Sequence, residues 1–222
     1  MFLPNIEGIL SIADRRSKES KRDGALVSIE STVPKGTSKK VFELLNHRLH
    51  VVHAPHRWYS LEEKEHGVNQ LRVIRGVSDC CLRVGMWFYD GYAIEGRQGK
   101  VNSATTHTSY HSGLGIPMHI VSNAETAEKT KIVENAHRYL QIAFAEELYL
   151  YCQENHISFS ELRDALNTKW NVNILEPREG IGGHCLPKDT KMFLDSSNPR
   201  KSQILTAAMG VDEDYRKFRA RF

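Results

Sequence analysis

Residues 182–189 hold the side chains best suited to chemistry. They run Gly-Gly-His-Cys-Leu-Pro-Lys-Asp. The two glycines let a ligand approach the backbone closely, and Lys188 places a cation near Cys185, which favours the thiolate that attacks a carbonyl carbon. The alternative is a buried structural cysteine in a turn, but such cysteines rarely have these neighbours. The segment therefore predicts a nucleophilic thiol at Cys185.

Three segments together resemble one enzyme family. Residues 182–189 resemble its cysteine signature, residues 30–37 (Glu-Ser-Thr-Val-Pro-Lys-Gly-Thr) its E-S-T-V-P-x-G-T strand end, and residues 127–135 its A-E-x-x-K-x-x-x-N helix. The segments occur in the family's order, and the likeness extends from about residue 5 to about residue 210. On these residues the chain resembles the UDP-glucose/GDP-mannose dehydrogenases. These enzymes oxidise the C6 alcohol of a nucleotide sugar to a carboxylate with two NAD.

The resemblance implies catalytic roles for five side chains. Cys185 captures the aldehyde as a thiohemiacetal and then carries the thioester, while Lys131 and Asn135 contact the substrate oxygen. Thr32 and Asp189 position the hydrolytic water and accept its proton. Spacing by itself supports only the shared helix face of Lys131 and Asn135, which are one turn apart. The simpler alternatives are a solvated lysine, a helix-capping aspartate and a strand-end hydroxyl.

The resemblance also implies two binding sets. The expected substrate contacts are Lys188, Arg178, His56, Arg57, Gly182 and Gly183, and the expected NAD contacts are Glu30, Ser31, Thr32 and Val33. Many family members have a glutamate at the position of His56, where it helps the thioester to hydrolyse. A histidine can act as a base near neutral pH. We take His56-Arg57 as a variant similar to the UDP-N-acetylmannosamine type, so a UDP-N-acetylhexosamine is the expected substrate.

Composition excludes several classes of function. The chain has 222 residues, of which 40% are hydrophobic and 26% charged, as in ordinary globular proteins. No apolar run reaches the ~18 residues of a membrane helix, and no signal peptide opens the sequence. The net charge of +3 is too small to indicate nucleic-acid binding, so the basic clusters at 15–22 and 216–221 predict solvated helix faces.

Cysteine and histidine spacing gives no metal motif. The four cysteines are Cys80, Cys81, Cys152 and Cys185, with no C-x-x-C, and the adjacent pair is a poor disulfide. A reduced, cytoplasmic setting fits this pattern. The histidines at 47, 50, 53 and 56 recur every three residues, but residues three apart on a strand face opposite sides of the sheet. We therefore predict no metal site.

Alternating apolar segments predict an α/β fold. The expected strands cover 25–29, 50–54, 72–77 and 116–121, and the expected helices between and before them cover 5–22, 37–47 and 78–89. Strands that alternate with helices indicate a doubly wound parallel sheet. Residues 1–121 are expected to form the rear part of a Rossmann-like NAD-binding domain, with a loop or insertion at about 91–113 that has no apolar periodicity.

Residues 122–222 are expected to form an all-helical central domain that carries the cysteine. Ser122 and Glu125 have capping-box spacing, and the following helix can continue to about residue 155 without proline or glycine. Some 30 residues make a rod of roughly 45 Å. In the resembling family this helix joins subunits, so a homodimer through 123–155 is expected. The alternative is a single long surface helix.

Two features of the family are not seen in this sequence. There is no G-x-G-x-x-G near the amino terminus, nor a match to the nucleotide-holding domain that ends family members. The chain thus resembles the middle of the enzyme, and two hypotheses remain. It is an NAD-dependent UDP-sugar dehydrogenase of polysaccharide biosynthesis, or part of one, or it is a non-catalytic remnant used for dimerisation. UDP-N-acetylmannosamine, UDP-glucose and GDP-mannose are not distinguished.

Overall fold

The computed structural model describes residues 6–19, 23–57, 67, 69–91, 113–196 and 202–221. The chain divides into two compact units, Pro4–Lys131 and Ile132–Phe222, here called the amino-terminal and the carboxy-terminal unit. Nearly all of the expected insertion at 91–113 lies outside the described residues. The division into domains at residue 121 stays a prediction.

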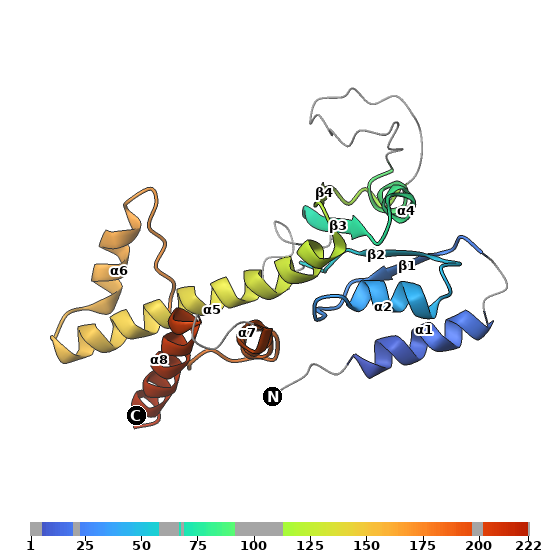
Figure 1. The fold of residues 1–222 in the computed structure, drawn as a ribbon. Coiled ribbons are helices and arrows are strands. Elements are labelled where there is room, and N and C mark those ends of the chain that lie inside the picture. The colour runs from blue at the N-terminus through green and yellow to red at the C-terminus, as the bar shows by residue number, and fades with distance from the viewer. Residues whose placement is uncertain are drawn as a thin grey trace. The chain divides into compact units, whose positions relative to one another are not determined.

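The amino-terminal unit is an α/β structure, as predicted (Figure 1). Its elements up to the second strand are α1 (Glu7–Glu19), β1 (Leu26–Ile29), α2 (Thr37–Leu44) and β2 (His50–His53). They are followed by β3 (Arg72–Gly76), α4 (Asp79–Tyr89) and β4 (Met118–Ile120). Each expected strand forms within one or two residues of its predicted ends, because its apolar run is bounded by turn-forming residues.

The sheet has the order β1-β2-β3-β4 and is mixed, which corrects the expectation of a wholly parallel sheet. The pairs β1–β2 and β3–β4 are parallel, whereas β2–β3 is antiparallel with Val52 opposite Gly76. Parallel neighbours need a crossover helix, and α2 and α4 supply one for each parallel pair. Between β2 and β3 the described residues contain no helix.

Apolar residues cover both faces of this sheet. On one face Val52 and Ile74 pack with Leu82 and Met86 of α4, and on the other Val51 packs with residues of α2 and α1. Adjacent residues of a strand point to opposite faces, so Val51 and Val52 enter different cores. The sheet is therefore buried on both sides, as its near-continuous apolar strands predict.

A tight turn joins β3 to α4. A Cβ atom on Gly76 would come within 2.3 Å of the backbone nitrogen of Leu82, so no larger residue fits there. Ser78 then caps α4, with its hydroxyl accepting from the backbone N–H of Cys81. The first turn of α4 is thereby held directly against the end of β3.

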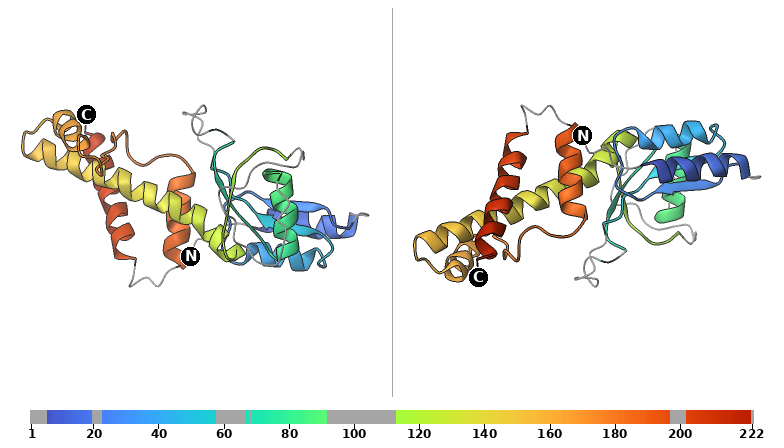
Figure 2. Two further views of the ribbon diagram at one scale, coloured as in Figure 1. Left: turned by 90° about the horizontal axis from the view of Figure 1, so that it is seen from above. Right: turned by 90° about the horizontal axis from the view of Figure 1, so that it is seen from below.

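The carboxy-terminal unit is helical (Figure 2). It contains most of α5 (Ala124–Glu154), which begins in the other unit, and all of α6 (Phe159–Asn167), α7 (Cys185–Ser196) and α8 (Gln203–Arg219). Its core joins Tyr139 and Ala143 of α5 to Ala208 of α8 and to Ile181. None of the described helices combines the length and apolar character needed to cross a bilayer.

The cap of α5 differs from the predicted capping box. The side chain of Asn123, rather than Ser122, accepts from the backbone N–H of Thr126 at 2.8 Å and from its hydroxyl at 2.9 Å. Asparagine is among the best N-cap residues, and this choice starts the helix one residue later than the box would. The long helix itself forms almost as predicted.

Candidate functional site

Cys185 is the first residue of α7, and its side chain is exposed. The preceding Gly182 and Gly183 are exposed too, and a Cβ atom on either would meet no other atom within 4 Å. Gly183 has a φ of 80°, which side chains rarely adopt. Backbone amides at a helix amino terminus stabilise negative charge. The thiol thus lies at a helix amino terminus, where a substrate can approach it.

A buried carboxylate lies one turn along the same helix. Asp189 has no exposed surface, and the amide of Asn135 on α5 donates to it at 2.5 Å. The ammonium of Lys188 lies 3.0 Å from its other oxygen. Residues four apart on a helix share a face, so Asp189 lies on the side of α7 that carries Cys185. The structure therefore brings together Cys185, Lys188, Asp189 and Asn135.

This geometry excludes the alternative that Asp189 caps a helix. Asp189 lies inside α7 and does not cap it, since the helix begins four residues earlier. Lys188 is paired with the neighbouring carboxylate and is mostly shielded from solvent, with 22% of its side chain exposed. Its charge therefore acts on Asp189 at short range.

The loop that leads to the cysteine is held by α8. The carboxylate of Asp212 accepts from the backbone N–H of Ile181 at 2.7 Å, and Arg216 donates to the carbonyl of Ile181 at 2.6 Å. The hydroxyl of Tyr215 donates to the carbonyl of Arg178 at 2.6 Å. The side chain of Arg178 itself is exposed. The backbone of the expected sugar-binding loop is thus fixed while its side chain stays accessible.

These α8 residues were not identified from the sequence. Arg216 belongs to the cluster at 216–221 that predicted a solvated helix face, yet it bonds Ile181 and Asp212. Arg219 pairs with Glu179 of the same loop at 2.6 Å. The available signal was the spacing of Asp212 and Arg216, four residues apart, which is typical of an ion pair on a helix. Nothing in the sequence indicated which loop Asp212 and Arg216 would contact.

Three other expected site residues are grouped in the amino-terminal unit. Glu30 follows β1, His56 follows β2, and Lys131 is the last residue of this unit on α5. Burial lowers the pKa of His56, and the charges of Arg72 and Lys131 lower it further, against the opposing effect of Glu30. His56 is therefore a neutral imidazole at neutral pH. Asn135, in the other unit, lies one turn beyond Lys131 on the same helix.

The expected NAD contacts lie at the carboxyl end of β1, where sheets of this type bind ligands. Ser31 is exposed, Thr32 is half-buried and Val33 is fully buried. The carboxylate of Glu30 is engaged by Arg72 at 3.2 Å and by the hydroxyl of Tyr89. Ser31 is therefore the most exposed member of this set.

The amino terminus of α2, just beyond this strand end, is filled by a carboxylate of the chain. Glu128 accepts from the backbone N–H groups of Gly36 at 2.5 Å and Ser38 at 2.7 Å, and from the Ser38 hydroxyl at 2.7 Å. Helix amino termini of such sheets often hold a phosphate. Here the position is taken, so α2 fits no pyrophosphate. The end of β1 can contact NAD, but the pyrophosphate of NAD cannot bind at the amino terminus of α2.

Comparisons with known proteins agree with this geometry. Residues 125–214 match the UDP-glucose/GDP-mannose dehydrogenase family, central domain. A UDP-N-acetyl-D-mannosamine dehydrogenase from Pyrococcus horikoshii is 31% identical over 85% of this chain and 42% of its own length. One from Campylobacter jejuni is 29% identical over 97% of this chain and 51% of its own.

A solved structure agrees as well. The UDP-D-ManNAc dehydrogenase of Pyrococcus horikoshii superposes with a TM-score of 0.78 at 28% identity, over 98% of this chain and 48% of that one. The chain spans about two fifths to one half of the length of these relatives. The likeness covers both units of the chain and includes the helix that carries Cys185.

Proposed function

Because the chain is a member of the UDP-glucose/GDP-mannose dehydrogenase family, whose central domain matches residues 125–214, we propose that it takes part in the NAD-dependent oxidation of a UDP-N-acetylhexosamine. The product is the C6 carboxylate, and UDP-N-acetylmannosamine is the favoured substrate. The exposed thiol of Cys185 beside the buried Asp189–Asn135 pair is the observation that carries this proposal. NAD, when bound, accepts a hydride in each of two oxidations.

Cys185 acts between those two oxidations. Its thiolate adds to the carbon of the C6 aldehyde, and the resulting oxyanion takes a proton to give a thiohemiacetal. Loss of hydride from that carbon and of the hydroxyl proton leaves a thioester. Water then adds to the thioester carbon, the C–S bond breaks, and the carboxylate and thiolate separate. One sugar alcohol, two NAD and one water thus give one carboxylate, two NADH and three protons.

Asp189 and Asn135 serve the hydrolytic half of this sequence. A water that attacks the thioester must lose a proton, and a carboxylate on the cysteine's side of α7 can accept it. The 2.5 Å hydrogen bond from Asn135 and the ion pair with Lys188 fix the orientation of that carboxylate. Burial around Asp189 removes competing water and strengthens each of these interactions.

Residues of the amino-terminal unit supply charge and a second base. Lys131 is half-buried and presents its ammonium on the helix face that also carries Asn135. A cation in that position stabilises the oxyanions of the alcohol, hemiacetal and tetrahedral stages. His56 is neutral near pH 7 because burial and neighbouring cations lower its pKa, so it can accept the proton that a glutamate accepts in other family members. Thr32 offers a hydroxyl to the same water.

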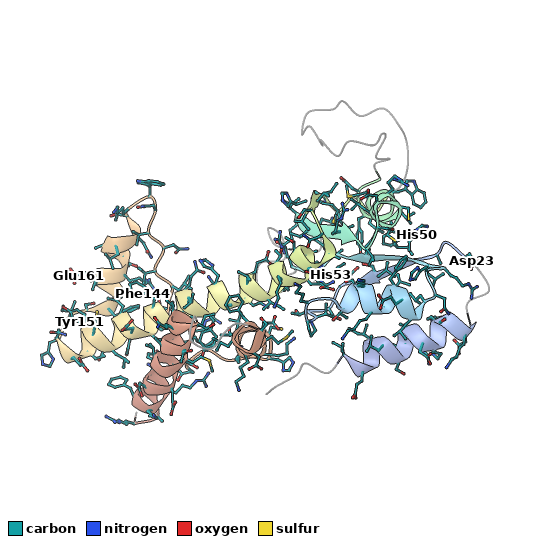
Figure 3. All side chains as sticks on the ribbon, in the orientation of Figure 1. Asp23, His50, His53, Phe144, Tyr151 and Glu161 are labelled. Carbon is teal, nitrogen blue, oxygen red and sulfur yellow. The ribbon has the colours of Figure 1, made fainter. Side chains whose placement is uncertain are left out.

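A homodimer through α5 is the second part of the proposal. Phe144 and Tyr151 project from this helix with 54% and 51% of their surface exposed (Figure 3). They lie seven residues apart, and so on one face of the helix. An exposed apolar face of this kind is typical of a protein interface. Replacing Phe144 by Glu should shift the chain from dimer to monomer in analytical ultracentrifugation. Gln153→Glu, at an exposed position on the opposite face of the same helix, should not.

The enzymatic proposal is tested by NADH formation from the purified chain. UDP-N-acetylmannosamine should give two NADH for each sugar, at a higher rate than UDP-N-acetylglucosamine, UDP-glucose or GDP-mannose. Cys185→Ser should reduce the rate by at least a thousandfold, while Cys152→Ser, a buried cysteine away from the site, should leave it within a factor of two. Absence of NADH with every sugar, together with no NAD binding by calorimetry, would support the dimerisation remnant instead.

A further inference from the structure

Three metal-ligand atoms meet at the edge of the amino-terminal unit. The imidazole of His50 and the thiols of Cys80 and Cys81 all lie within 4.8 Å of one another. Cys80 is exposed, Cys81 is buried and His50 is partly buried. Among the described residues this is the one cluster of its kind, and none of its members takes part in the chemistry proposed above.

The antiparallel pairing of β2 and β3 creates this cluster. Val52 lies opposite Gly76, and the backbone N–H of Val77 bonds the carbonyl of Val51. Continuing this register by one residue brings His50 opposite Ser78, which caps α4. Figure 3 shows His50 on β2 beneath α4. In a parallel pair His50 would lie at the far end of β3 from the cysteines, so the prediction of a parallel sheet concealed the site.

Local structure directs both thiols to one side. Cys80 and Cys81 are the second and third residues of α4, and the hydroxyl of Ser78 lies 3.0 Å from the sulfur of Cys80 and 3.1 Å from that of Cys81. The free backbone amides at this helix terminus stabilise negative charge. Two thiolates carry two such charges. The immovable turn at Gly76 holds the terminus in place.

We propose that His50, Cys80 and Cys81 bind a thiophilic cation of the zinc class, with water or the Ser78 hydroxyl as the fourth ligand. Two thiolates and one imidazole are the ligands that Zn²⁺ prefers, and two thiolates balance its charge. Zn–S bonds of about 2.3 Å at tetrahedral angles separate the sulfurs by about 3.8 Å. From separations within 4.8 Å, the ligands need to close by no more than about 1 Å, which side-chain rotation allows.

Two simpler interpretations compete with the proposal. Cys81 belongs to the core between α4 and the sheet, where a free cysteine is often only a small apolar side chain. Core packing does not explain the exposed Cys80 or the imidazole that faces both thiols. A disulfide between adjacent cysteines is the second alternative, and it would require an oxidising partner and leave His50 without a role.

The test is Co²⁺ and Zn²⁺ titration of the reduced, metal-free chain. One equivalent of Co²⁺ should produce thiolate charge-transfer and tetrahedral d–d absorption, and one equivalent of Zn²⁺ should abolish both. Binding should release protons from the thiols, measurable in weakly buffered solution. Cys80→Ser should weaken Zn²⁺ binding at least a hundredfold. Since Cys80 is exposed, circular dichroism should show that this variant keeps its fold.

Matched controls assign the site. His50→Gln should weaken binding at least tenfold, whereas His47→Gln, a histidine in the exposed turn before β2, should not. Cys185→Ser, which removes the other exposed thiol, should also leave the cobalt spectrum unchanged. Undiminished binding by Cys80→Ser, loss of binding in Cys185→Ser, or a protein that binds no cobalt and instead loses two thiols on oxidation would each overturn the proposal.

Discussion

Each unit carries cysteine in the first turn of a helix, and the surroundings of the two helix starts differ. In the carboxy-terminal unit α7 opens on a single exposed thiol, after two glycines with empty space around them. In the amino-terminal unit α4 carries two adjacent thiols, after a glycine with no room for a Cβ atom. The first helix start is open to a substrate, and the second is a rigid corner.

The partners of the thiols differ as well. Four residues after Cys185 comes the buried carboxylate of Asp189, the base in the proposed hydrolysis, whereas four residues after the α4 cysteines come Val84 and Gly85. The α4 thiols instead face the imidazole of His50. Both thiol sites lie in the first turn of a helix. The neighbours of each thiol therefore decide whether the site suits a nucleophile or a metal ligand.

The largest effect is expected at Asp189, the residue by which the start of α7 differs most from the start of α4. Asp189→Asn keeps the shape of the side chain and removes the base, so NADH formation should fall 100- to 10,000-fold. Asp195→Asn, an exposed aspartate on the same helix, should change it less than twofold. A steady-state assay with UDP-N-acetylmannosamine measures both. If the Asp189→Asn variant turned over normally, the carboxylate would not distinguish the two helix starts. The starts of α7 and α4 would then differ only in how accessible their thiols are.

Each unit also buries a titratable side chain without a hydrogen bond, an acid in one unit and a base in the other. Neither oxygen of Glu146 on α5 and neither nitrogen of His53 on β2 has a hydrogen-bond partner among the described residues. Both side chains are fully buried. A buried acid and a buried base favour their neutral forms, so the two units should respond to pH in opposite directions.

Alkaline pH should destabilise the carboxy-terminal unit. Burial and the charge of Asp212 raise the pKa of Glu146 from 4.5 to about 8, against the opposing charge of Arg216. The folded chain then holds a proton that the unfolded chain releases, so stability present below pH 4.5 is lost as pH rises through 8. At about 1.36 kcal/mol for each pH unit, the loss is roughly 5 kcal/mol over that window.

Hydrogen exchange of the α5 and α8 amides between pH 5 and 9 measures this loss. Glu146→Gln should remove the pH dependence, and Glu147→Gln, an exposed neighbour, should retain it. Equal slopes in the two variants would show that another group is responsible.

Acid should destabilise the amino-terminal unit. Burial lowers the pKa of His53 from 6.5 to about 4, so between these values the unfolded chain binds a proton that the folded chain does not. Stability is therefore complete above pH 6.5 and falls by about 3 kcal/mol on acidification to pH 4. Exchange of the β2 amides should show the fall in the wild type and in His47→Gln, and its absence in His53→Leu. A wild type with level stability from pH 7 to pH 4 would contradict the assignment.

The sequence was sufficient to predict the elements, including the long helix that carries both Lys131 and Asn135. Apolar runs and turn residues gave each strand within one or two residues, and the spacing of Lys131 and Asn135 gave a real shared face. Local patterns carry no information about strand direction, however. The β2–β3 pair was therefore predicted to be parallel although it is antiparallel, and the neighbours of His50 were missed. The contacts of Arg216 with Ile181 and of Glu128 with Ser38 join residues that are 35 and 90 positions apart. No periodicity within one element encodes such pairs.

The smallest effect should come from a third helix start, at α2, which the chain fills with its own anion. Glu128 there accepts two backbone N–H groups and one hydroxyl, so Glu128→Gln should lower the free energy of unfolding by about 1–2 kcal/mol in urea titrations. Glu125→Gln breaks only an exposed ion pair with Lys35 and should cost less than about 0.5 kcal/mol. Because the variant leaves donors that face no charge, inorganic phosphate should restore part of its stability and leave the wild type unchanged. If phosphate stabilised both proteins equally, Glu128 would not be the anion that fills the amino terminus of α2. This helix start would then not differ from those of α4 and α7.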